Sequence, residues 1–346
     1  MFDEVFETKQ LILTDWRTVK VKFILGIVIS VVFLCLALRN VSYAKLFASL
    51  QGVHYLYLIP AILLSLLTMW LRALRWRYLL EPIKRVSNHS LFSAVMIGFM
   101  ANNVLPVRMG EFVRAYAIGK KENLSKTLSF ATIVVERILD GFTLLAFLLV
   151  MVIFFPFPDW AKKAGVLAFA FYLLVIVFLF LLKKHRENMF RFLNYILSPV
   201  SEHITQKVSQ LLESFIAGLD VLKGKRQIAL ILFYSVSIWI VYGILTHLLF
   251  MAFNFTLPAY APFLLIVVVT FGAMIPSSPG FIGTFQFFCV TGLAFLGVKE
   301  SDALGFSLVC HASQYFPVTF LGLFYLWKDN MSLKEIKESN AADKDL

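Results

Sequence analysis

The stretch LSFATIVVERILDGFTLLAFLLVMVIFF, residues 128–155, determines the fold class of this chain. It is longer than the roughly 20 apolar residues that a helix needs to cross a bilayer. Glu136, Arg137 and Asp140 lie inside it. A charge at the centre of a membrane helix costs about 2.5–3.5 kcal/mol, so we expect these side chains to face the interior of a helical bundle and to find partners. The i,i+4 spacing places both carboxylates on one face, and Arg137 can pair with Asp140 at i,i+3.

The composition of the whole chain agrees with this local pattern. Of its 346 residues, 60% are hydrophobic and 15% are charged, whereas soluble domains have about 45–50% apolar and about 25% charged residues. A soluble enzyme, a disordered chain and a disulfide scaffold are therefore excluded. The apolar runs are continuous, and a membrane β-barrel would alternate apolar with polar residues. We predict an all-α, polytopic integral membrane bundle of six to eight transmembrane helices.

The net charge of +11 is explained by Lys and Arg in cytoplasmic loops, so we expect no nucleic-acid partner. The positions of the basic loops predict a multi-pass protein of the cytoplasmic membrane with both termini inside. The three cysteines lie in apolar runs without ligand spacing, so we expect no metal and no cofactor. The predicted segments are a cytoplasmic segment at 1–20, a membrane domain at 21–328 with an amphipathic cytoplasmic helix at about 200–222, and a polar tail at 329–346.

Two short apolar segments end in Pro/Gly-containing stretches. Residues 91–105 are too short to span and have basic loops on both sides, which predicts a re-entrant hairpin. Both interruptions read Pro-x-x-x-Gly-x-Phe, at 106–112 and at 279–285. Three crossings between them give the two copies opposite orientations, and such pairs indicate the site of a transporter built as an inverted repeat. The alternative is two chance turns in ordinary loops.

The charged residues leave alternatives open. The charged residues of the 128–155 run form either the wall of a cavity for a headgroup, or a carboxylate that carries a coupling proton, or a buried ion-pair lock. Their expected partners are Arg108, Glu111 and Arg114. Arg72 and Arg75, near Trp76, are either an interfacial anchor or a site that captures lipid phosphate. For His311 and Gln314 we expect a hydrogen bond between helices.

Three motifs in order carry a resemblance to a known family. They are Asn102-Asn103-x-Leu-Pro-x-Arg-x-Gly-Glu-x-x-Arg114, Glu136-Arg137-x-x-Asp140, and Pro276-x-x-Pro-Gly-x-x-Gly-x-x-Gln286. The chain resembles the flippase-like transmembrane region of lysylphosphatidylglycerol synthases over roughly residues 20–328. The resemblance implies a helical translocase for a headgroup-modified phospholipid or glycolipid. Full synthases add a large soluble aminoacyltransferase domain, and here only residues 328–346 follow the last predicted span, so we expect no aminoacylation.

The predicted function is therefore a lipid flippase without a catalytic residue, driven by an ion or lipid gradient because no P-loop is present. The alternatives are an integral-membrane transferase that uses Glu136 and Asp140, or an accessory subunit of lipid-linked sugar or envelope lipid synthesis. The expected partners are a membrane lipid as substrate and, among proteins, a second copy or a lipid-synthesis enzyme. The predicted substrate-binding residues are Arg72, Arg75, Asn102, Asn103, Pro106, Arg108, Gly110, Glu111, Arg114, Glu136, Arg137, Asp140, Pro276, Ser277, Ser278, Pro279, Gly280, Gly283 and Gln286.

Overall fold

The computed structural model describes residues 24–105, 109–154, 159–185 and 224–332, with the single residues 187, 191, 209 and 335. Throughout this part the chain is helical and contains no strand, which confirms the all-α membrane class. The predicted amphipathic helix at 200–222, Pro106 and Arg108 lie outside the described residues.

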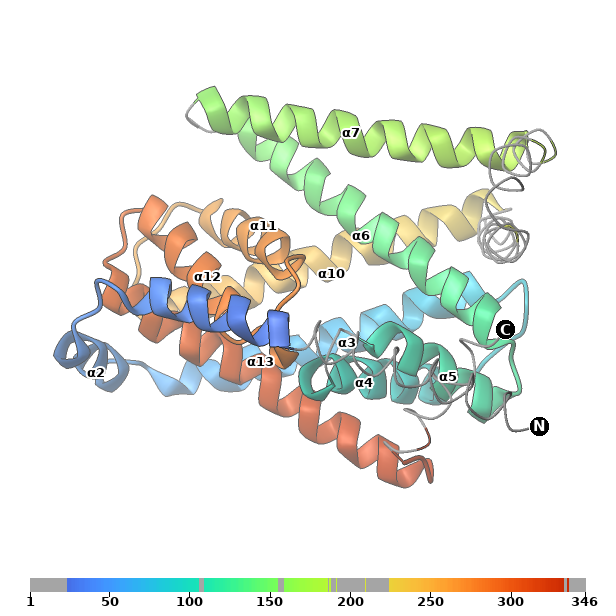
Figure 1. Ribbon diagram of the computed structural model, residues 1–346, viewed down its shortest axis with the longest axis horizontal. Helices are drawn as coiled ribbons and strands as arrows, with labels where there is room; N and C mark the ends of the chain where they lie inside the picture. Colours follow the sequence, from blue (N-terminus) through green and yellow to red (C-terminus); the bar gives the residue numbers. More distant parts are fainter. Residues whose placement is uncertain are drawn as a thin grey trace, which may run out of the picture. The chain divides into compact units, whose positions relative to one another are not determined.

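Figure 1 shows the described helices in their order along the chain. Their bounds are Ile24–Leu38, α2 Tyr43–Gln51, η1 Tyr55–Tyr57, α3 Leu58–Leu80, α4 Asn88–Val104, α5 Gly110–Glu122, α6 Lys126–Phe154, α7 Asp159–Lys184, α10 Lys225–Ala252, α11 Ala261–Ala273, η3 Pro279–Phe281, α12 Thr284–Phe295 and α13 Glu300–Lys328. Both predicted interruptions are present as breaks, one between α4 and α5 and the other between α11 and α12.

Length and apolarity identify the candidate membrane spans among the described residues. Two helical stretches qualify, Tyr55–Leu80 and Lys225–Ala252. The helices Ile24–Leu38 and Tyr43–Gln51 meet at 85° and make a third candidate if the bent pair forms one span. The count of six to eight spans, and the re-entrant path of the broken segments, stay predictions.

The chain divides into two compact units, and each is described by itself. The first unit holds the described residues of 1–62, 100–110 and 246–319, and the second holds those of 63–99, 111–245 and 320–346.

In the first unit, α11 and α12 form an antiparallel hairpin that depends on two glycines. A Cβ atom on Gly272 would lie 2.1 Å from the ring of Phe288, and one on Gly292 would lie 2.9 Å from Leu265. Because both residues lack a side chain, the two helices approach each other closely at these positions. The helix Ile24–Leu38 contacts α12 through Phe33, whose ring centroid lies 4.9 Å from that of Phe287.

In the second unit, α6 and α7 form a hairpin of long helices (Figure 1). The hydroxyl of Tyr172 on α7 lies against Gly141 on α6, where an added Cβ would be 2.0 Å from the oxygen. Trp76 and Leu79 on α3, Leu91 on α4 and Ile118 on α5 are fully buried in the core of this unit. This packing surrounds the middle of α6, where its charged residues lie.

Candidate functional site

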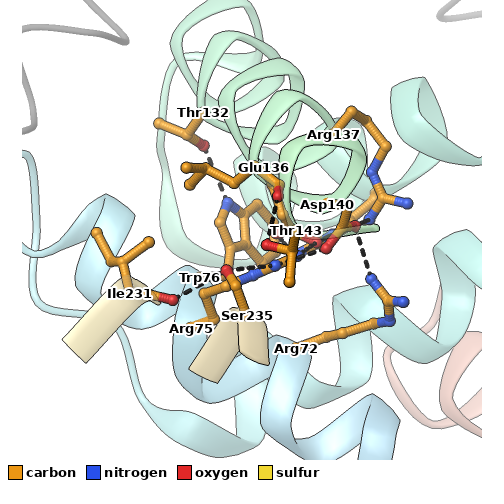
Figure 2. Close-up of polar contacts among 12 residues, drawn as sticks. Arg72, Arg75, Trp76, Thr132, Glu136, Arg137, Asp140, Thr143, Ile231 and Ser235 are labelled. Atoms are coloured by element: carbon orange, nitrogen blue, oxygen red, sulfur yellow. Dashed lines mark hydrogen bonds and ion pairs between the residues drawn. The ribbon is translucent and has the colours of Figure 1, made fainter. Parts of the chain in front are cut away.

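A cluster of six charged side chains lies in the second unit, and we call it the arginine cluster. Its members are Arg72 and Arg75 of α3, Arg114 of α5, and Glu136, Arg137 and Asp140 of α6. Figure 2 shows the guanidiniums of α3 directed at the carboxylates of α6. The α3 residues belong to a candidate membrane span. The cluster is therefore an ionic network that includes side chains of a candidate membrane span.

Glu136 is completely buried and contacts three guanidiniums. Arg114 holds it with two parallel hydrogen bonds of 3.0 and 2.9 Å. The Arg75 Nη2 atom lies 3.1 Å from its Oε1 atom, and Arg137 donates to the same oxygen at 2.8 Å. A bidentate Arg–carboxylate pair is strong and geometrically specific, so Arg114 and Glu136 fix α5 against α6.

Asp140 lies one helical turn further along α6. Its Oδ1 atom accepts a hydrogen bond of 2.6 Å from Arg75, and its Oδ2 atom accepts one of 2.9 Å from Arg72. The Arg137 Nη2 atom is 3.5 Å from Oδ2. Arg75 also donates to Ser235 of α10 at 2.9 Å. This one side chain thus connects three helices and contacts both carboxylates.

Aromatic rings surround the guanidiniums. The indole Nε1 of Trp76 donates to Thr132 at 2.9 Å, and the Arg114 Cζ atom lies 3.9 Å from the centre of the same indole. The Cζ atoms of Arg72 and Arg137 lie 5.4 and 5.9 Å from the ring centre of Phe99. Such cation–π contacts stabilise positive charge away from water.

Positive charge exceeds negative charge in the cluster, with four guanidiniums and two carboxylates. Glu111 is close enough to Arg137 to attract it electrostatically. All four carboxylate oxygens of Glu136 and Asp140 contact a guanidinium. Several donors have no hydrogen-bond acceptor among the described residues: the buried Nε atoms of Arg72, Arg75, Arg114 and Arg137, and the indole Nε1 of Trp239.

The expected pairing of Arg137 with a nearby carboxylate is confirmed. Arg72 and Arg75 had two alternative interpretations, and the burial of both side chains and of Trp76 argues against the interfacial anchor. Both guanidiniums pair with carboxylates of α6 instead. Arg114, an expected partner of the α6 charges, does pair with Glu136 and is 2% exposed. The two arginines of α3 were missed as partners of α6, because their local sequence does not show whether they reach headgroups or a buried carboxylate.

The loop between α11 and α12, in the first unit, contains the second group of predicted residues. Its backbone has positive φ angles of 69° at Gly280 and 92° at Gly283. The Gly283 N–H donates to the side chain of Gln286 at 2.8 Å, and the Ser278 N–H donates to Ser30 at 2.7 Å. Thr284 donates to the hydroxyl of Ser277 at 3.2 Å. Side chains of the protein therefore satisfy the backbone N–H groups of Ser278 and Gly283.

The side chain of Gln286 connects this loop to α13. Because its Oε1 atom accepts from Gly283, its Nε2 atom donates, and the acceptor 3.0 Å away is Nδ1 of His311. The ring of His311 stacks on Phe285 with centroids 4.5 Å apart. The interhelical hydrogen bond expected for His311 is confirmed. The interhelical hydrogen bond expected for Gln314 was wrong, since Gln314 donates to the Cys310 carbonyl oxygen within its own helix.

The end of the first interrupted segment lies in the same unit. The side-chain oxygen of Asn102 accepts from the Gly110 N–H at 2.8 Å, across the break between α4 and α5. Asn103 donates to Thr319 of α13 at 2.8 Å. A Cβ atom on Gly280 would lie 3.3 Å from the Asn103 carbonyl oxygen, so the two interrupted segments meet here. The predicted residues thus form two groups, and their union in one cavity stays a prediction.

Gly283→Ala is expected to destabilise the protein clearly more than Gly297→Ala. Both glycines have positive φ angles, of 92° and 83°, which cost an L-residue roughly 1–2 kcal/mol. Only at Gly283 would the new Cβ meet another atom, the Ser30 carbonyl oxygen at 2.1 Å, whereas nothing lies within 4 Å at Gly297. Thermal unfolding of the two purified variants measures the difference, and equal unfolding temperatures would contradict the packing of Ser30 on this loop.

Comparisons with known proteins find UPF0104 membrane proteins that match most of this chain and a glycosyltransferase that matches part of it. A UPF0104 membrane protein of Methanothermobacter thermautotrophicus is 26% identical, covering 86% of this chain and 92% of that protein. Another UPF0104 membrane protein, of Methanocaldococcus jannaschii, is 23% identical, covering 86% of this chain and 91% of that protein. The glycosyltransferase AglD of Haloferax volcanii is 26% identical, but the match covers only 39% of this chain and 23% of AglD.

No solved structure matches the chain. The sequence profile of the lysylphosphatidylglycerol synthase TM region matches residues 23–322, nearly the whole membrane domain predicted from the sequence. This match includes every member of the arginine cluster and both interrupted segments. The protein is therefore a membrane-embedded, multi-pass protein that belongs to the lysylphosphatidylglycerol synthase TM region family.

Proposed function

We propose that this chain is a lipid translocase that moves a phospholipid or glycolipid headgroup between the leaflets of the cytoplasmic membrane. The observation that carries the proposal is the arginine cluster, whose side chains are almost completely buried apart from that of Arg137. Charged residues inside membrane helices are costly and usually mark the path of a substrate or ion. The cluster also has several buried donors without an acceptor among the described residues, which a ligand with oxygen acceptors would satisfy.

The breaks in the helices support the same proposal. A translocase has to shelter a polar headgroup across about 30 Å of hydrocarbon while the acyl chains stay in the bilayer. Non-helical backbone at membrane depth is tolerated only where protein or water covers it. In the described parts of the two breaks, side chains of Asn102, Ser30 and Gln286 accept hydrogen bonds from backbone N–H groups. We propose that the arginine cluster lines a groove that is polar inside and apolar at its rim.

A second candidate function is an accessory role in the synthesis of lipid-linked sugars. The partial match to the glycosyltransferase AglD favours it. Catalysis by the chain itself is less well supported, because Arg114, Arg72 and Arg75 occupy the oxygens of the two candidate carboxylates. A general acid or base needs a carboxylate oxygen within reach of the substrate.

Labelling of outer-leaflet lipids in cells with and without the gene distinguishes the two functions. A translocase changes the leaflet distribution of one lipid at an unchanged total amount. An accessory subunit changes the total amount of one lipid, and this result without a change of distribution would overturn the proposal. Accessibility of cysteine tags at both termini, measured in the same cells, tests whether the ends lie on the cytoplasmic side.

A further inference from the structure

We propose that the arginine cluster binds the phosphate group of a lipid whose headgroup has a net negative charge, and that Arg72 and Arg137 are the residues that contact it. This inference rests on the proposed translocase function and specifies its substrate class. It follows from three features of the cluster: which hydrogen-bonding atoms remain free, where the two guanidiniums meet, and which guanidinium is accessible.

The free hydrogen-bonding atoms of the cluster are donors. Each oxygen of Glu136 and Asp140 already contacts at least one guanidinium. By contrast, Nε of Arg72 and Nε1 of Trp239 are buried and have no hydrogen-bond acceptor among the described residues. A buried donor without a partner costs about 1–3 kcal/mol. A ligand that supplies oxygen acceptors would remove this cost, whereas an ammonium group would find no free carboxylate oxygen.

The guanidiniums of Arg72 and Arg137 both lie close to Asp140 and to Phe99. The Oδ2 atom of Asp140 lies 2.9 Å from Nη1 of Arg72 and 3.5 Å from Nη2 of Arg137. Both guanidiniums also lie near the ring of Phe99, and in the view of Figure 2 they lie on either side of Asp140, away from Trp76. Like charges held this close repel each other, so a bound anion stabilises the pair. Arginine forms bidentate contacts with phosphate.

Arg137 is the accessible member of the cluster, with a side chain 37% exposed, while Arg75 is 0% exposed. Each carboxylate of the cluster also keeps two other guanidinium partners if Arg137 is removed. Without Arg137, Glu136 keeps Arg114 and Arg75, and Asp140 keeps Arg72 and Arg75. Arg137 is therefore available to a ligand without loss of the ionic network.

The test is ligand-dependent thermal unfolding of the purified full chain in a neutral detergent. The probes are phosphatidylglycerol, phosphatidylcholine, lysyl-phosphatidylglycerol, diacylglycerol and inorganic phosphate. We expect phosphatidylglycerol to raise the unfolding temperature most, and diacylglycerol not to raise it. An equal or larger shift with lysyl-phosphatidylglycerol would overturn the preference for a net negative headgroup. A shift with inorganic phosphate as large as that with phosphatidylglycerol would show a site for free phosphate and overturn the lipid assignment.

Two variants locate the binding site, and a third is the control. Arg137→Gln is expected to weaken phosphatidylglycerol binding by about tenfold or more, because a hydrogen bond to a charged group contributes that much. Trp239→Phe removes the unpartnered N–H, so it should not lower the unfolding temperature without lipid but should reduce the shift that phosphatidylglycerol causes. Arg77→Gln removes one exposed charge from α3, the helix that carries Arg72, and this variant should bind phosphatidylglycerol like the unchanged protein. Unaltered binding by both Arg137→Gln and Trp239→Phe would overturn the site.

This binding test is independent of transport. Selective binding of phosphatidylglycerol without any translocation would refute the proposed function and leave the anion site in place. Translocation with no preference among the lipids would refute the anion site and leave the proposed function in place.

Discussion

Arg75→Met is expected to leave little or no folded protein. Arg75 is fully buried, it contacts both Glu136 and Asp140, and it donates to Ser235 of α10. Removal of one partner from a buried ion pair costs about 3–5 kcal/mol, a large part of the roughly 5–15 kcal/mol that stabilises a native domain. Methionine has similar length, so the change removes the charge and the hydrogen bonds and leaves most of the volume.

The yield of monodisperse protein in detergent and its thermal unfolding temperature measure this effect. Arg77→Met is the matched control, because Arg77 lies two residues away on α3 and is exposed. It should behave like the unchanged protein. Arg75→Met protein that is recovered in normal yield and unfolds at the same temperature would contradict the ionic network at the centre of the second unit.

Glu136→Gln is expected to have the second largest effect, a destabilisation of about 3–5 kcal/mol. The variant leaves four guanidiniums with Asp140 as their one carboxylate in the cluster, so repulsion among them adds to the lost contacts. The substitution Glu81→Gln, at an exposed position, is the control and should stay within about 0.5 kcal/mol.

A double-mutant cycle shows whether this effect arises at Arg114. Arg114 and Glu136 form two hydrogen bonds, so Arg114→Gln should cost less in the Glu136→Gln background than in the unchanged protein. Residues in contact show coupling energies of about 0.5–3 kcal/mol. Additive effects, measured by thermal unfolding of the four proteins, would mean that the pair does not form.

The sequence was sufficient to predict the fold class and the paired state of the charges in α6. Both follow from one physical constraint, because hydrocarbon neither solvates charges nor forms hydrogen bonds with backbone N–H and C=O groups. The identity of the partners did not follow. An arginine at the end of an apolar run looks the same whether it reaches headgroups or folds back onto a carboxylate. The choice depends on how α3 packs against α6, which the local sequence of Arg72 and Arg75 does not show.

The α11–α12 loop shows the same limit. Pro276, Pro279, Gly280 and Gly283 mark a break in the helix, and the break is present. The sequence does not show which groups accept hydrogen bonds from its backbone N–H groups. Ser30, far away in the chain, accepts from Ser278, while Gln286 accepts from Gly283. Such long-range acceptors are set by tertiary packing, and serine and glutamine are too common for spacing alone to reveal them.

The central claim is that the arginine cluster serves the translocation of an anionic lipid, and reconstituted vesicles test it most directly. Vesicles with fluorescent phosphatidylglycerol are prepared with the unchanged chain, with Arg137→Gln or with Arg77→Gln, and a membrane-impermeant reductant quenches the outer leaflet. We predict that the unchanged chain and Arg77→Gln make inner-leaflet phosphatidylglycerol accessible to the reductant, and that folded Arg137→Gln does so at most at about a tenth of that rate. Equal rates for folded Arg137→Gln and the unchanged chain, or no protein-dependent quenching at all, would contradict the claim.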